Sequence, residues 1–102
     1  METPAINEYF TFLKEQGYLL PEVIPGGRYK AIFPFLFTHA IILGRLGDRE
    51  GYEDRWCYKG LGEALQGFYA WDGTGEPDGW IRHPATSRRR PEGIPETEYI
   101  NP

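Results

Sequence analysis

Residues 28–46 read RYKAIFPFLFTHAIILGRL, and this stretch decides the fold. Its apolar residues recur with a period closer to two than to 3.6, which is typical of β-strands. We predict two strands within it, the second over about residues 40–46. Pro34 cannot donate a backbone hydrogen bond, so it indicates that the first strand lies at a sheet edge or contains a bulge. Asp54–Tyr58 is predicted as a third short strand, and sequential pairing of the three gives an antiparallel meander.

Helical patterns lie on both sides of these strands. Thr3 followed by Pro4 is a typical helix start, and the first helix is predicted over about residues 4–16. The second is predicted over about residues 61–72, because apolar residues recur there at helical spacing. These are Leu61, Ala64, Leu65, Phe68 and Trp71.

Gly62 and Gly67 interrupt the second helix, at a cost of roughly 1 kcal/mol each relative to alanine. Close approach of the helix to the sheet would explain them. The predicted fold class is therefore α+β: a helix, a three-stranded antiparallel meander, a helix, and then an extended tail rich in proline, glycine and arginine.

The composition changes after Gly73, where prolines and glycines interrupt every periodic pattern. We predict a compact domain over residues 1–73 and an extended tail over residues 74–102, packed on the domain or projecting from it. Trp80 and Ile81 form the apolar pair that could anchor this tail, so we expect Trp80 to be buried against the second helix or the sheet.

Composition limits the classes of protein to consider. A chain of 102 residues with 40% hydrophobic residues is expected to form one folding unit. A net charge of −4 is too weak to indicate a DNA mimic and does not predict a general affinity for nucleic acid. The single cysteine, Cys57, fits a reducing compartment, and no apolar run is long enough for a membrane span. We expect a cytoplasmic protein that neither binds nor crosses a membrane.

The tail and the third strand carry the candidate binding residues. Guanidinium groups bind phosphate or carboxylate, and flat rings stack on bases or arginines. The candidates are Trp80, Arg82, His83, Arg88, Arg89 and Arg90 of the tail and Arg55 and Trp56 of the strand. Three interpretations stay open: a structural strap whose arginines pair with surface acids, a phosphate or nucleic-acid site, and an arm that docks on a protein.

Catalytic and metal-binding alternatives have weaker support in the sequence. An enzyme would use Cys57 or the Glu53 and Asp54 pair, but strand alternation puts Cys57 with Arg55 on the face opposite Trp56, as in an ordinary half-buried strand. The separations of the histidines and the cysteine match no zinc pattern. No metal site and no cofactor are therefore predicted.

Several segments together resemble small uncharacterised proteins carried by bacteriophages and prophages. They are PFLFTHAII (34–42), GYEDRWCY (51–58), AWDG (70–73) and GWIRHP (79–84), and the resemblance covers about residues 28–93. The resemblance implies an accessory protein that works inside a bacterial cell, with no known activity.

The first functional hypothesis is a non-catalytic protein that binds a host or phage macromolecule, such as a host or defence factor that it would inhibit. Its contacts would come from the aromatic sheet edge and the arm at residues 80–91. The alternative is a nucleic-acid or nucleotide binder that holds phosphates with the tail arginines, and the third is a small enzyme. A homodimer through the free edge of the strand that contains Pro34 is also expected.

Overall fold

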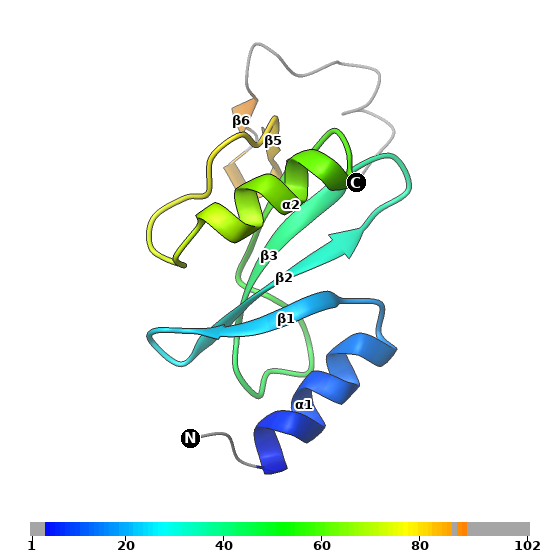
Figure 1. Ribbon diagram of the computed structural model, residues 1–102, viewed down its shortest axis with the longest axis vertical. Coiled ribbons are helices and arrows are strands. Elements are labelled where there is room, and N and C mark those ends of the chain that lie inside the picture. Colours follow the sequence, from blue (N-terminus) through cyan, green and yellow to red (C-terminus); the bar gives the residue numbers. More distant parts are fainter. Residues whose placement is uncertain (1–3, 87, 90–102) are drawn as a thin grey trace.

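The computed structural model describes residues 4–86 and 88–89, without the side chains of residues 4, 5, 85, 88 and 89. The elements are α1 (Pro4–Glu15), β1 (Leu19–Ile24), β2 (Arg28–Pro34), β3 (His39–Arg45), β4 (Asp54–Tyr58), α2 (Leu61–Ala70), β5 (Arg82–His83), a short 3-10 helix (Pro84–Thr86) and β6 (Arg88–Arg89). The strands form one antiparallel sheet in chain order, β1 to β6 (Figure 1).

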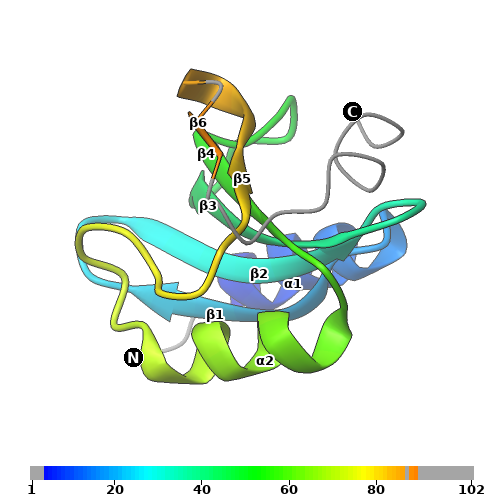
Figure 2. The same ribbon diagram turned by 90° about the horizontal axis from the view of Figure 1, so that it is seen from above.

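The two helices cover opposite faces of this sheet, because side chains alternate between the faces along each strand. Tyr9 and Leu13 of α1 pack on one face, in a cluster with Tyr29, Ala31, Ala40, Ile42 and Cys57. Phe68 of α2 packs on the other face, in a cluster with Ile32, Ile41, Leu43, Trp56, Tyr58 and Trp80. In Figure 2 the sheet twists strongly, so that β4 to β6 rise away from β1 and β2. The predicted alternation of Cys57 and Trp56 in β4 is confirmed.

The prediction of a three-stranded meander is wrong. Both predicted helices and the three predicted strands are present as α1, α2, β2, β3 and β4, but β1 precedes them and β5 and β6 follow in the predicted tail. β1 contains Pro21 and is followed by Pro25, and prolines are depleted in strands, so the sequence predicts no strand in this segment. Strands of two residues, such as β5, are too short to show any periodic pattern.

β1 forms one edge of the sheet, and the prediction that Pro34 marks an edge strand is wrong. β2 lies between β1 and β3, and it tolerates Pro34 because this proline is its last residue, opposite His39. In β1 the register shifts between Leu19 and Glu22. Leu20 has a φ of 54°, which is rare for a residue with a bulky side chain. The bulge occurs in β1 and not in β2.

The first part of the tail is tied to the domain. Trp80 is 4% exposed and Ile81 is 6% exposed, and Trp80 belongs to the core cluster under α2. The Ile81 amide donates a hydrogen bond of 2.8 Å to the Cys57 carbonyl, and the Tyr58 hydroxyl donates one of 2.7 Å to the Asp78 carbonyl. The prediction that Trp80 is buried as a structural anchor is confirmed.

A buried lysine fixes the position of α2 on the sheet. Lys30 of β2 is 4% exposed, and its ammonium group donates hydrogen bonds of 2.6 Å to the Phe68 carbonyl and 2.7 Å to the Trp71 carbonyl. Carbonyls at the end of a helix lack helical partners and carry partial negative charge, so a cation stabilises them. The same ammonium lies 4.3 Å from the centre of the Phe68 ring. These contacts hold the C-terminal end of α2 over β2.

Candidate functional site

The residues of the predicted tail site differ in their surroundings: Trp80 is buried, whereas residues of β5 and β6 pair through their backbones. The Trp80 ring is in the core and is not open to a base. Pairing of β5 with β6 sets Arg82 opposite Arg89 and His83 opposite Arg88. Arg90 lies outside the described residues. The register therefore brings the backbones of basic residues together at the end of the sheet, while Trp80 is buried in the core.

His83 joins β5 to β4 through its ring. Its Nε2 lies 2.5 Å from Asp54 Oδ1 and its Nδ1 lies 2.7 Å from Thr86 Oγ1. The ring also stacks on Trp56, with centroids 5.2 Å apart and planes at 8°. Both rings are buried, at 4% and 2% exposure, so His83 and Trp56 act as structural contacts in this conformation. The sequence analysis did not connect Asp54 with His83, because 29 positions separate them.

Arg55 points to the opposite face from Trp56. Its guanidinium lies 4.6 Å from the centre of the Phe35 ring, and it donates a hydrogen bond of 3.3 Å to the Tyr52 hydroxyl. Arg55 is thus engaged with aromatic side chains beside α1, on a different face from the stacked rings of β4 and β5.

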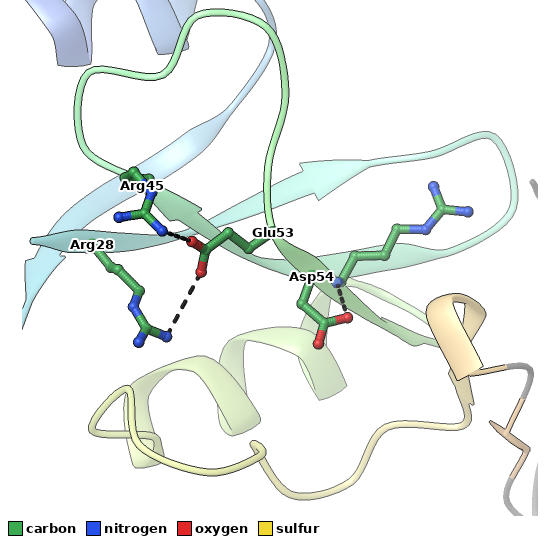
Figure 3. A network of polar contacts seen from close by, with 5 residues as sticks. Arg28, Arg45, Glu53 and Asp54 are labelled. Atoms are coloured by element: carbon green, nitrogen blue, oxygen red, sulfur yellow. Dashed lines mark hydrogen bonds and ion pairs between the residues drawn. The ribbon is translucent and has the colours of Figure 1, made fainter. Parts of the chain in front are cut away.

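The carboxylates proposed for an enzyme have separate partners. Figure 3 shows Arg28 and Arg45 converging on Glu53, at N···O distances of 3.7 Å and 3.0 Å, while Asp54 points away from both arginines. Cys57 is 0% exposed, so its thiol cannot meet a dissolved substrate in this conformation. Among residues 4–86 and 88–89, no cluster of three or more His, Cys, Asp or Glu side chains could hold a metal ion.

An apolar groove lies between β1 and α2 on the described surface. It has a volume of about 610 Å³, within the usual range of ligand sites. We call it the β1–α2 groove, and its lining residues are Lys14, Tyr18, Leu19, Leu20, Ile32, Leu61, Leu65 and Tyr69. The sequence analysis missed this groove.

The walls of the groove expose large apolar side chains. On α2, Leu61, Leu65 and Tyr69 are four residues apart and form one stripe, in which Leu61 is 42% and Tyr69 is 67% exposed. On β1, Leu19 is 39% and Leu20 is 46% exposed. Leu20 keeps its unfavourable positive φ although its side chain is half exposed, and such strain is typical of functional sites.

One end of the groove carries a charged residue, Lys14. In Figure 1, α1 ends, β1 begins and α2 begins on the same side of the molecule, and Lys14 and Tyr18 come from this end. Lys14 is exposed and is the charged residue among the described lining residues. Tyr18 contributes its ring to the groove, while burial beside Tyr29 in the cluster on the α1 face raises the pKa of its hydroxyl.

The signal that could have revealed the groove is the width of the apolar face of α2. The helical spacing places Leu61 and Leu65 in one apolar pattern together with Phe68. In the structure, Phe68 is 1% exposed, whereas Leu61 and Leu65 lie at the side of the contact with the sheet. When the apolar stripe of a helix is wider than its contact with the sheet requires, the excess width indicates a second contact surface.

Comparisons with known proteins give no family for this chain. The chain matches no protein-family model, no curated protein and no solved structure. No helix in the described part of the chain is long and apolar enough to cross a membrane.

Proposed function

We propose that the protein is a non-catalytic binding protein that docks a segment of a partner protein in the β1–α2 groove. The observation that carries this proposal is the stripe of Leu61, Leu65 and Tyr69, which is exposed beside Leu19 and Leu20 of β1. Contiguous apolar patches with a polar rim are characteristic of interaction sites. The docking surface is thus different from the arm that the sequence suggested, because the first residues of that arm, 80–83, are folded onto β4.

The construction of the groove supports a preformed site. Lys30 and Phe68 fix α2 over the sheet, and the buried face of α2 holds its exposed stripe in place. A rigid site loses little conformational entropy when it binds. The groove can therefore receive a partner without reorganising the core.

The proposed setting is the cytoplasm of a bacterial cell, with a host or phage protein as the partner. Its support is the resemblance of the segments at residues 34–42, 51–58, 70–73 and 79–84 to small phage and prophage proteins. Occupation of a surface on a host or defence factor would make the protein an inhibitor of that factor.

A charge placed in the groove is expected to abolish binding without unfolding the protein. Tyr69 is 67% exposed, so Tyr69→Asp should change stability little but should reduce partner binding by at least about tenfold. Leu36→Asp is the matched control, because Leu36 is 80% exposed and is not among the residues of the groove. Quantitative affinity capture from a bacterial lysate compares the two variants with the wild type. Equal recovery of every captured protein by the wild type and Tyr69→Asp would contradict the proposal.

A second candidate function is phosphate binding by the basic end of the sheet, because β5 and β6 pair Arg82 with Arg89 and His83 with Arg88. Arginine guanidinium groups bind phosphate in a bidentate way. Such binding to labelled single-stranded DNA or RNA should weaken steeply between about 50 and 200 mM salt. No binding at the lower salt concentration would reject this candidate.

A further inference from the structure

The edge of β1 is poorly suited to receive a strand from a partner. Strand addition needs a continuous row of backbone donors and acceptors. Pro21 has no amide hydrogen, Leu20 has left-handed backbone geometry, and the register shifts between Leu19 and Glu22. Natural sheets use prolines and bulges to prevent edge pairing. An occupant of the groove therefore has to bind through its side chains.

The α2 wall is suited to pack against another helix. Residues spaced by four along a helix form a ridge, and ridges of two helices interdigitate in the commonest packing classes. Leu61, Leu65 and Tyr69 form such a ridge over about 12 Å of helix axis. The groove beside this ridge has Ile32 of the sheet and Leu20 of β1 among its other lining residues, so an apolar stripe of a partner helix would be covered on several sides.

The positive charge of Lys14 at one end of the groove favours an occupant with an acidic residue at that end. Lys14 forms no ion pair within the described part of the chain. The described lining residues include no acid, so two grooves facing each other in a symmetric dimer would offer Lys14 no opposite charge. Charge complementarity thus favours a different molecule with a carboxylate at this position.

We propose that the occupant of the β1–α2 groove is an amphipathic helix of a partner protein, with its apolar stripe on Leu61, Leu65 and Tyr69 and an Asp or Glu beside Lys14. This inference rests on the proposed function and adds the class of partner. Helix-in-groove recognition by apolar anchors at helical spacing is a recurrent binding mode.

Selection from a random peptide library tests the class of occupant. Peptides of about 16 residues, enough for about four helical turns, are displayed on yeast and selected on the wild-type chain, with counter-selection on Tyr69→Asp. The expected result is enrichment of peptides with apolar residues at i, i+4 and i+7 and an acid near one end. Enriched peptides with period-two patterns or with prolines throughout would overturn the helical occupant but leave the groove as a docking site. If every enriched peptide binds Tyr69→Asp as well as the wild type, both proposals are overturned.

A charge exchange tests the role of Lys14. The most enriched peptide is synthesised with a fluorescent label, together with a variant in which the acid becomes lysine, and fluorescence anisotropy measures the affinity of each. Lys14→Glu should lower the affinity for the acidic peptide by about two- to fivefold, as for other exposed ion pairs, and should raise the affinity for the lysine variant of the peptide. If the wild type and Lys14→Glu prefer the acidic peptide over its lysine variant by the same ratio of affinities, the proposed contact with Lys14 is contradicted.

A second copy of the chain is the competing occupant. Light scattering of the wild type and of Tyr69→Asp distinguishes it. A wild-type dimer that dissociates on this substitution would overturn the proposal, because the groove would then be filled by the chain itself. A monomer in both cases is now the expected result, because the strand that contains Pro34 is paired on both sides and offers no free edge for the homodimer that the sequence suggested.

Discussion

Trp80→Ala is expected to lower the free energy of unfolding by roughly 3–5 kcal/mol, as truncation of large aromatic side chains in cores does. Trp80 is 4% exposed and packs in one cluster with Trp56, Tyr58 and Phe68. The loss is a large part of the stability of a small domain, about 5–15 kcal/mol, so the denaturant midpoint of the variant should fall markedly. Chemical denaturation followed by tryptophan fluorescence and far-UV circular dichroism measures the change.

The control for this substitution is Leu36→Ala, since Leu36 is 80% exposed and should change stability by less than about 0.5 kcal/mol. A loss as small as this for Trp80→Ala would contradict the role of Trp80 as an anchor. The expected effect also means that a chain ending at Gly73 would lose part of its core, so point substitutions are better tests of binding than removal of the tail.

Gly67→Ala is expected to destabilise the protein by roughly 1–3 kcal/mol, although alanine is the better helix former. A Cβ atom at Gly67 would lie 2.6 Å from the Tyr58 hydroxyl oxygen and 2.8 Å from the Asp78 carbonyl oxygen. It would therefore displace the hydrogen bond that ties the tail to β4. Thermal unfolding and denaturant titration both measure the loss.

Gly62→Ala is the matched control within the same helix. A Cβ atom at Gly62 meets nothing within 4 Å, so this substitution should stabilise the protein by about 0.5–1 kcal/mol through helix propensity alone. Equal effects of the two substitutions would contradict the close approach of α2 to Tyr58 and Asp78. Close approach thus explains Gly67 but not Gly62.

Periodicity predicted those parts of the fold in which several residues repeat a pattern. α1, α2 and the strands β2 to β4 follow from it, and so does the opposite placement of Cys57 and Trp56. The anchoring of Trp80 was predictable because an isolated apolar pair in a polar segment requires a contact. These predictions depend on local pattern and on the tendency of large apolar side chains to be buried.

The remaining elements depend on contacts between distant residues. In β1, Leu20 has a positive φ and Pro21 lies within the register shift, and no local rule favours a strand with these features. β5 consists of two residues that are held by the Asp54 contact with His83. The groove depends on how much of α2 the sheet covers, and the pattern of Leu61 and Leu65 alone does not show which of them a neighbour buries.

The most direct test of the β1–α2 groove is an NMR titration of the full chain with the selected acidic peptide. Amide and methyl shifts are expected to concentrate at Leu19, Leu20, Leu61 and Tyr69, with a smaller change at Lys14, while β5 stays unchanged. Shifts that concentrate at Arg82 and His83, with the groove unaffected, would contradict the central claim that this protein binds its partner between β1 and α2.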